Sequence, residues 1–178
     1  LYTKLANVYH EMYQSRFDYK KIFNFLKIVL HKYKCNKILE IGCGTGLLTQ
    51  YFLKFNFTYL GVDISKDMLR IAKEVEPKGN FLVGDMRNIK VKNKFDAVII
   101  VGRSFTYMRT NEDTMSSLKY INNVLKNRGL LIFDNFDAGY IFNNFNKRII
   151  FNSKFKDRKY KRISHNSFNL KNGFTWDI

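Results

Sequence analysis

The first part of the chain alternates polar and apolar positions at the spacing of a helix. Between residues 3 and 34, apolar side chains recur every three or four positions with lysines between them. This period places the apolar side chains on one face and predicts helix over the whole segment. The positions that carry the pattern are Ile22, Leu26, Val29, Leu30 and Tyr33.

From residue 37 onward, short and almost continuously apolar runs are separated by amphipathic segments. Helices are expected at residues 46–55, after a capping Ser65, and at residues 115–127, where Gly129 ends the last of them. Such runs between helices are typical of a parallel sheet covered on both faces. Right-handed crossovers then give a doubly wound, mostly parallel α/β sheet of Rossmann-like type. The five predicted strands are residues 37–41, 58–63, 80–85, 95–101 and 130–135.

The pattern changes after residue 138, where extended segments of alternating polarity take over. The stretch RIIFNSKFKDRKYKRISHNSF predicts antiparallel strands that turn near Lys156 and Asp157. We therefore divide the chain into two parts. Residues 1–138 are expected to form the α/β domain with an N-terminal helical cover, and residues 139–178 a small C-terminal antiparallel β annex.

Charge and composition leave two readings open. The chain has 31 basic and 15 acidic residues, a formal net charge of +16. Such a balance can mark a nucleic-acid binder. The sequence is also crowded with Lys, Asn, Ile, Phe and Tyr and has one proline. An A·T-rich genome produces this bias without any polyanionic partner.

Neither a membrane nor an oxidising compartment is indicated. The longest wholly apolar stretch, near residues 97–102, is far shorter than the roughly 20 residues of a membrane span. No signal peptide is visible. Two cysteines, Cys35 and Cys43, are too few for a disulfide framework or a structural zinc site. We therefore expect a cytoplasmic protein with no membrane partner.

Three glycines follow the first predicted strand. Gly42, Gly44 and Gly46 lie where an open α/β sheet binds its ligands, at the carboxyl ends of the strands. Their spacing is G-x-G-x-G, which differs from the G-x-G-x-x-G of a dinucleotide loop. No Gly-Lys-Ser/Thr follows, so a Walker loop is excluded as well.

Three acidic residues narrow the choice of ligand. Glu40 precedes the glycines, and Asp63 and Asp85 end the next two strands. Clustered carboxylates would repel a pyrophosphate and favour a cation. Asp63 is placed to accept from both ribose hydroxyls, Asp85 from an adenine amine, and Glu40 can orient the loop amides or approach an ammonium group. A ribose, an adenine, an amine and a positive charge together describe S-adenosylmethionine.

The motifs ILEIGCGTG, GVDIS, FLVGDM and FDAVIIV resemble, in order and spacing, those of class I S-adenosylmethionine-dependent methyltransferases. The resemblance covers roughly residues 37–135. It implies that the glycines let the methionine part approach the backbone, that Asp63 holds the ribose, and that Asp85 binds the adenine amine between Ile64 and Met86. The expected cofactor-binding residues are Tyr13, Tyr19, Glu40, Gly42, Cys43, Gly44, Gly46, Asp63, Ile64, Met68, Asp85 and Met86.

The N-terminal segment YHEMYQSRFDY resembles the leading segment of small-molecule methyltransferases of the sugar N-methylating type. The resemblance implies that Tyr13 and Tyr19 belong to a mobile helix that covers the cofactor. The alternative is that both are ordinary core or surface aromatics of an amphipathic helix.

The annex departs from the family pattern. The family sheet has seven strands, the last two forming a hairpin, whereas only 43 residues follow Asn135 here. We expect an inserted annex, with the last strands beyond residue 178, in preference to an abbreviated sheet. The C-terminal wall of the acceptor pocket therefore stays undetermined.

Several chemistries are disfavoured by absent motifs. No Asn-Pro-Pro-aromatic turn follows the fourth strand, which argues against methylation of adenine amines in DNA or of glutamine amides. Neither cysteine is placed to be the nucleophile of a C5-cytosine enzyme. Asp134 and Asn135 resemble half of the magnesium site of catechol-type O-methyltransferases. Gly102 and Arg103 stand where the second aspartate belongs, so no metal is expected.

Residues after the fourth and fifth strands should border the transferred methyl group. Arg103, Ser104, Tyr107 and Asp134 are the candidates for the acceptor pocket, and a guanidinium suits a phosphate or carboxylate. The alternative is a solvated Arg103 and a Tyr107 that packs under the next helix. No general base is evident.

We expect a methyltransferase that acts on a small-molecule N or O acceptor. One alternative is an RNA methyltransferase, because basic and aromatic residues are interleaved at residues 147–162. The other is a non-catalytic protein that binds S-adenosylmethionine. A pocket plugged by Phe105 or Phe136 would favour that binder, and a pocket open past Ser104 and Tyr107 an enzyme. The annex is also a candidate contact for a homodimer.

Overall fold

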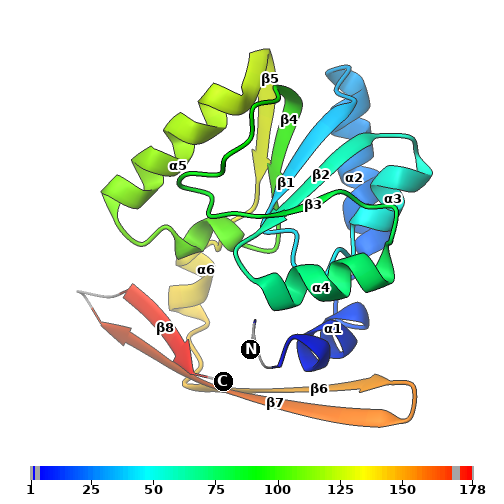
Figure 1. Ribbon diagram of the computed structural model, residues 1–178. Helices are drawn as coiled ribbons and strands as arrows, with labels where there is room; N and C mark the ends of the chain where they lie inside the picture. The colour runs from blue at the N-terminus through cyan, green and yellow to red at the C-terminus, as the bar shows by residue number, and fades with distance from the viewer. Residues whose placement is uncertain (1, 3–4, 170–172, 178) are drawn as a thin grey trace.

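A computed structural model describes residue 2 and residues 5–169 and 173–177 of the chain (Figure 1). Five parallel strands form one sheet in the order β3-β2-β1-β4-β5. This order runs outward from β1 in both directions and confirms the doubly wound, Rossmann-like sheet expected from the sequence. The strands are β1 (Lys37–Ile41), β2 (Thr58–Asp63), β3 (Phe81–Val83), β4 (Phe95–Ile100) and β5 (Leu125–Phe133).

Helices cover both faces of this sheet. One face packs against α2 (Tyr19–Lys32) and α3 (Thr49–Lys54), and the other against α5 (Asn111–Val124). The remaining helix of the sheet, α4 (Lys66–Val75), contacts β2 and β3. Because β1 and β4 are buried on both faces, their sequences are almost continuously apolar, as a central parallel strand requires.

The N-terminal segment is two helices, so the prediction of one helix over residues 3–34 was wrong. Helix α1 (Ala6–Gln14) ends four residues before Asp18, and α2 begins directly after it. The Asp18 carboxylate accepts a hydrogen bond from the Lys21 amide at 2.9 Å. This side chain caps α2, which gives the backbone a favourable alternative to continuous helix.

The predicted helix at residues 115–127 is displaced. Thr110 caps α5 by accepting from the Asp113 amide at 3.1 Å, and the helix ends at Val124 rather than near Gly129. Strand β5 starts at once, since Leu125 pairs with Phe95 of β4. The register of this pair shifts between Phe95 and Ala97, and pairing with β4 overrides the helical pattern of these residues.

Smaller differences concern two other elements. Helix α3 begins at Thr49 rather than at residue 46, because Gly46 has a φ of +75°. Strand β3 is shorter than predicted and spans Phe81–Val83. The Ser65 cap is confirmed, since its hydroxyl accepts from the Met68 amide at 3.2 Å.

The C-terminal part forms the expected antiparallel annex, with additions. Strands β6 (Arg148–Phe155) and β7 (Arg158–Asn169) pair as a hairpin that turns at residues 156–157, as predicted. The sequence did not indicate helix α6 (Ala138–Asn143) or the third strand, β8 (Gly173–Asp177).

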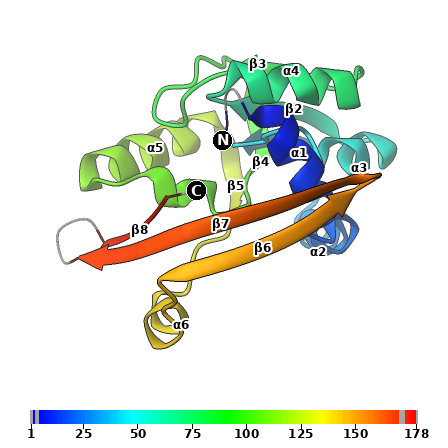
Figure 2. The ribbon, with the colours of Figure 1, turned by 90° about the horizontal axis from the view of Figure 1, so that it is seen from below.

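Figure 1 shows the annex below the main sheet, and both Figures 1 and 2 show α1 next to the β6–β7 hairpin. Helix α1 contacts β6 on one side and α4 on another. The annex therefore lies next to the N-terminal helical cover, which is where it can take part in a site. In the part of the chain that the structure describes, no helix has both the length and the apolarity to cross a membrane.

The largest aromatic cluster of the core gives a matched test of the fold. The Phe23 ring is fully buried and lies 5.2 Å from the Phe52 ring and 6.3 Å from the Phe57 ring, centroid to centroid. Phe23→Ala should lower the free energy of unfolding by about 3–5 kcal/mol, because it leaves a cavity. Phe25→Ala on the same helix is the control: its ring is 63% exposed, so the loss should stay below about 0.5 kcal/mol. Urea denaturation measures both, and equal losses would contradict this packing.

Candidate cofactor and acceptor site

The loop after β1 depends on backbone conformations that glycine adopts readily. Gly42, Gly44 and Gly46 all have positive φ, at +77°, +56° and +75°. The Gly42 amide donates to the Val62 carbonyl of β2 at 2.7 Å, which ties the loop to the neighbouring strand. A Cβ on Gly42 would lie 2.6 Å from the Ser104 hydroxyl oxygen, whereas one on Gly44 would meet nothing within 4 Å. The position of Gly42 therefore has no room for a side chain, whereas the backbone at Gly44 faces open space.

Asp63 holds this loop from the end of β2. Its carboxylate accepts from the Gly44 amide at 2.8 Å and from the Ser65 amide at 2.9 Å. Burial raises the pKa of the Asp63 carboxyl, and these amides act in the opposite direction. Each oxygen has a further lone pair, so the carboxylate can still accept from a ligand hydroxyl. The role of orienting a loop amide, considered for Glu40, belongs to Asp63.

Glu40 is a buried carboxyl below the glycine loop. It is 3% exposed, and the Tyr59 hydroxyl donates to it at 2.5 Å. The Thr49 hydroxyl in turn donates to Tyr59 at 3.1 Å. Burial raises the pKa of Glu40 to about 7, and the Tyr59 hydrogen bond limits the rise. A buried carboxyl with this pKa would change its charge when a cation binds beside it.

The glycine loop opens into a cavity of about 420 Å³, the glycine-loop cavity. Tyrosines and phenylalanine from the N-terminal cover form one wall, and the ends of β1, β4 and β5 form the others. Of the expected cofactor residues, six line this cavity: Tyr13, Tyr19, Glu40, Gly42, Cys43 and Gly44. Burial raises the pKa of the Cys43 thiol well above its usual value, which fits a small, unreactive filler.

The remaining expected cofactor residues lie outside the wall of this cavity. Met68 is buried against Ala6, between α4 and α1, and Ile64 is 67% exposed. Met86 packs against the core on the α5 face of the sheet. Gly46 likewise lines neither of the two cavities described here. The structure therefore brings together the residues expected at the methionine end, and those expected at the adenosine end lie further along the strand edge.

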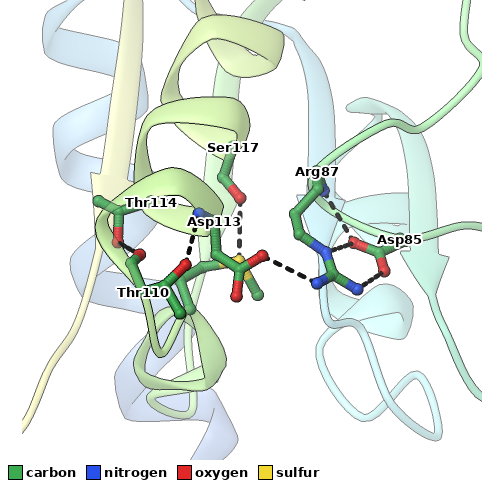
Figure 3. Close-up of polar contacts among 7 residues, drawn as sticks. Asp85, Arg87, Thr110, Asp113, Thr114 and Ser117 are labelled. Atoms are coloured by element: carbon green, nitrogen blue, oxygen red, sulfur yellow. Dashed lines mark hydrogen bonds and ion pairs between the residues drawn. The ribbon is translucent and has the colours of Figure 1, made fainter.

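At the adenosine end, the Asp85 carboxylate already has a partner. Arg87 donates to it from both Nε, at 2.9 Å, and Nη2, and donates to Asp113 of α5 from Nη1 at 2.9 Å (Figure 3). The hydrogen bonds from Arg87 lower the pKa of Asp85, so this carboxyl stays ionised. An adenine amine at Asp85 would share the carboxylate with Arg87.

Helix α1 covers the glycine loop through a polar contact and an aromatic stack. The His10 Nδ1 atom lies 2.8 Å from the hydroxyl of Thr45, inside the loop. The rings of Tyr9 and Tyr13 stack with centroids 4.1 Å apart and an interplanar angle of 16°. Tyr9 begins the N-terminal segment that carries the resemblance but was not among the expected cofactor residues, although its position four residues before Tyr13 on one helix face was a usable signal.

The four residues expected in the acceptor pocket lie in different surroundings. The Asp134 carboxylate accepts from the Gly102 amide at 3.0 Å and from the Arg103 amide, so it fixes the turn after β4. The Ser104 hydroxyl donates to the Val101 carbonyl at 3.2 Å and faces Gly42, and Ser104 lines neither cavity. The other two candidates, Arg103 and Tyr107, line a second cavity.

This second cavity, the annex cavity, has a volume of about 520 Å³. Its walls come from α1, the turn after β4, α6 and the β6–β7 hairpin. It meets the glycine-loop cavity at residues that line both, which are Tyr9, Tyr13, Gly102, Arg103 and Asn135. Two ligands bound in the two cavities would therefore approach one another at this shared wall.

No group of three or more His, Cys, Asp or Glu residues that could hold a metal ion occurs within the described part of the chain. The absence of a metal stays a prediction. For S-adenosylmethionine, the donor set fits: an open glycine backbone, a buried acid and a carboxylate with free lone pairs converge on one strand edge.

Comparisons with known proteins agree with this geometry. Residues 38–129 match the family described as methyltransferase domain. YqeM of Bacillus subtilis (strain 168), whose name assigns it to the methyltransferases, is 32% identical over 138 residues, 75% of this chain and 55% of YqeM. The dTDP-3-amino-3,4,6-trideoxy-alpha-D-glucopyranose N,N-dimethyltransferase of Streptomyces venezuelae is 28% identical over 101 residues, 57% of this chain and 43% of that enzyme. The chain thus spans about half the length of these two curated relatives.

Among solved structures, the fold is similar to that of Streptomyces venezuelae DesVI. The TM-score is 0.82 at 24% sequence identity, and the match covers 94% of this chain and 72% of DesVI. This chain therefore belongs to the methyltransferase-domain family, and its resemblance to the class I S-adenosylmethionine-dependent methyltransferases is confirmed.

Proposed function

We propose that this chain forms the core of an S-adenosylmethionine-dependent methyltransferase that methylates a nitrogen or oxygen of a small molecule. The observation that carries the proposal is the wall shared by the two cavities. The cofactor's methionine end would lie in the glycine-loop cavity and the acceptor in the annex cavity. Tyr9, Tyr13 and Gly102 stand where the two would meet.

The residues that would hold the cofactor are Glu40, the glycine loop, Asp63 and Asp85. When bound, S-adenosylmethionine supplies a methyl group carried on a sulfonium sulfur. The leaving group is then a neutral thioether. The chain's own contribution is then to hold the acceptor in line and to exclude water. Such alignment can contribute about 7–11 kcal/mol in favourable cases.

The tyrosines at the shared wall favour an amine acceptor. Burial raises the pKa of both Tyr9 and Tyr13, so their phenols stay protonated and donate hydrogen bonds rather than remove protons. Asp134 is held by backbone amides. An amine attacks with its own lone pair, whereas a hydroxyl needs a base. The name of the Streptomyces venezuelae N,N-dimethyltransferase supports the same choice.

The shape of the annex cavity supports an enzyme over a non-catalytic binder. Phe105 packs against the core and lies 5.2 Å from the Phe133 ring, outside both cavities. Phe136 forms part of the cavity wall, and a volume of about 520 Å³ remains. Neither phenylalanine fills the space expected for an acceptor.

The contacts of the basic run at residues 147–162 support a small molecule over RNA. Arg158 and Tyr160 both contact Glu11 of α1, and Arg162 donates to the Tyr13 hydroxyl. These side chains are engaged in holding α1, and Phe151 lines the annex cavity, whereas the other six basic residues of the run are exposed. An RNA surface would instead present aromatics and cations together to solvent.

We further expect the protein in the cytoplasm, since both cysteines are free thiols and the cofactor is a cellular metabolite. A homodimer contact through the annex stays a prediction.

Asp63→Ala tests the cofactor site. The substitution removes the two charge-assisted hydrogen bonds expected to the ribose, each worth about 1.5–3 kcal/mol, and also releases the Gly44 and Ser65 amides, so the affinity for S-adenosylhomocysteine should fall at least about 100-fold. Isothermal titration measures this, with circular dichroism to verify the fold. Asp67→Ala, the same change in the exposed first turn of α4, is the control and should bind normally. Unchanged affinity in Asp63→Ala would show that Asp63 does not hold the ribose.

Glu40 predicts a pH dependence of binding. Its pKa of about 7 means that the carboxyl becomes ionised as the pH rises through neutrality, and the ionised form attracts an ammonium group. The affinity for S-adenosylhomocysteine should therefore increase from pH 6 to pH 8. Glu40→Gln should weaken binding at the higher pH and flatten the profile.

The raised pKa of Glu40 also determines how the free energy of unfolding changes with pH in the ligand-free protein. The folded-state pKa of about 7 lies above the ordinary value of 4.5, so the folded state favours the protonated carboxyl. The stability that the protonated Glu40 carboxyl contributes is fully present below about pH 4.5 and is lost as the pH rises through about 7. Glu40→Gln should exceed the unsubstituted protein in stability above pH 7 and match it near pH 4.5. A stability difference that does not change with pH would place the carboxyl in a solvated environment, and the opposite trend would mean that the folded state stabilises the ionised form.

A transfer assay tests the acceptor class. The chain is incubated with S-adenosylmethionine carrying a tritiated methyl group and pools of small amines, nucleotide sugars and total RNA. We expect label in a small-molecule pool. Label in RNA, together with a submicromolar RNA affinity that falls steeply with salt, would support the RNA alternative. Tight cofactor binding with no transfer to any pool would support the binder.

A further inference from the structure

Three arginines from distant parts of the sequence line the annex cavity. Arg16 lies between α1 and α2, Arg103 follows β4, and Arg162 is in β7. We propose that these three guanidinium groups form a binding site for a phosphoryl group of the methyl acceptor. The inference rests on the proposed function, since it describes the substrate of the same site.

The first observation is that the three cations lack anionic partners. Among the residues that the structure describes, no carboxylate lies within ion-pair distance of Arg16, Arg103 or Arg162. Arg70, Arg87 and Arg158 each have such a partner, and Arg109, Arg128 and Arg148, which also have none among the described residues, do not line the cavity. Three unpaired guanidinium groups around one cavity repel one another, and an anion in the cavity would remove that cost.

Arg162 shows the clearest unmet hydrogen-bonding capacity. One terminal nitrogen donates to the Tyr13 hydroxyl, but its Nε is buried and has no hydrogen-bond partner. A buried donor without a partner is costly, and most native examples have a functional explanation. A phosphoryl oxygen in the annex cavity would supply the missing acceptor.

Aromatic rings hold the other two guanidinium groups in place. The Arg16 guanidinium carbon lies 4.1 Å from the Phe151 ring centroid, and that of Arg103 lies 5.0 Å from the Phe136 centroid. Both also lie against Phe17, at 5.5 and 5.6 Å. A ring contacts the face of a guanidinium and leaves the N–H groups at its edge available. These arginines are therefore oriented without using the donors that an anion needs.

The three charges act on one small region. Arg162, Arg16 and Arg103 all oppose the rise in the pKa of Tyr13 that burial causes. The nearby carboxylates are engaged elsewhere: Asp137 caps α6 through the Tyr140 amide at 3.0 Å, and Asp134 accepts from backbone amides. Asp137 also lines the annex cavity, so three guanidinium groups face one carboxylate there and the field is positive, unlike that below the glycine loop.

A phosphoryl group fits this site better than a carboxylate does. One guanidinium satisfies a carboxylate through two parallel hydrogen bonds, whereas a phosphate or diphosphate offers more oxygens and more charge than one arginine can match. With its phosphoryl group at the arginines, the acceptor would extend toward Tyr9 and Gly102 at the shared wall. The anion would thus position the reacting nitrogen or oxygen.

The test titrates inorganic pyrophosphate into the full chain by calorimetry, with S-adenosylhomocysteine present. We expect saturable binding that weakens at least tenfold in Arg162→Gln and in Arg103→Gln. Arg70→Gln removes the same charge from an exposed site on α4 and should change the affinity less than twofold. Arg162→Lys keeps the charge but loses the Nε donor, and should bind less tightly than the unsubstituted protein. Equal weakening in Arg70→Gln would show non-specific charge attraction and overturn the site.

Two further measurements use the unsubstituted protein, so they do not depend on the folding of any variant. Pyrophosphate should protect Arg16, Arg103 and Arg162, and not Arg70, from phenylglyoxal, as mapped by mass spectrometry. Malonate should compete poorly, and competition as strong as that of pyrophosphate would overturn the choice of a phosphoryl group. S-adenosylhomocysteine affinity separates the two proposals. If it binds normally and pyrophosphate does not bind, the anion site is wrong and the proposed function stands. If S-adenosylhomocysteine does not bind, the proposed function is wrong.

Discussion

The position of α1 between the glycine loop and the annex is the constraint on which both cavities depend. His10 contacts Thr45 on the loop side, while Glu11 accepts from Arg158 and Tyr160 on the annex side. Tyr13 lies between them and accepts from Arg162. The helix is therefore attached to both the glycine loop and the annex by polar contacts, and its tyrosines form the wall that the two cavities share. Without it, the two cavities would lose the wall that they share.

The attachment is made of interactions that are individually weak. Arg158 is 73% exposed in its pair with Glu11, and exposed ion pairs contribute about 0–1 kcal/mol. The aromatic contacts around Tyr9 and Tyr13 add a similar amount. Helix α1 buries few residues, Ala6 and Met12. Movement of α1 would leave the main core intact, because few of its residues are buried.

The electrostatics of the site are divided in a way that the net charge of +16 conceals. Carboxylates gather at the ends of the parallel strands, where Glu40 is buried, Asp63 is partly buried and Asp85 is paired with Arg87. Arginines gather in the annex cavity. A cationic cofactor and an anionic acceptor would each meet the complementary field, and the opposite placement would be penalised on both sides. The surface lysines contribute little to this local pattern because solvent screens them.

The sequence by itself determined the sheet, the glycine loop and the acids at the strand ends. These features depend on local periodicity and on the rule that parallel strands bring their carboxyl ends to one edge, so they can be derived without knowledge of long-range contacts. It also determined the Ser65 cap and the turn of the annex hairpin. The tertiary structure decided where α5 ends, because pairing of Leu125 with Phe95 outweighs a helical pattern. It alone brought Arg162 to Tyr13, 149 residues apart, and Tyr59 to Glu40. Contacts of this kind leave no periodic trace in the sequence, since they depend on which strands and helices lie next to one another in the folded chain.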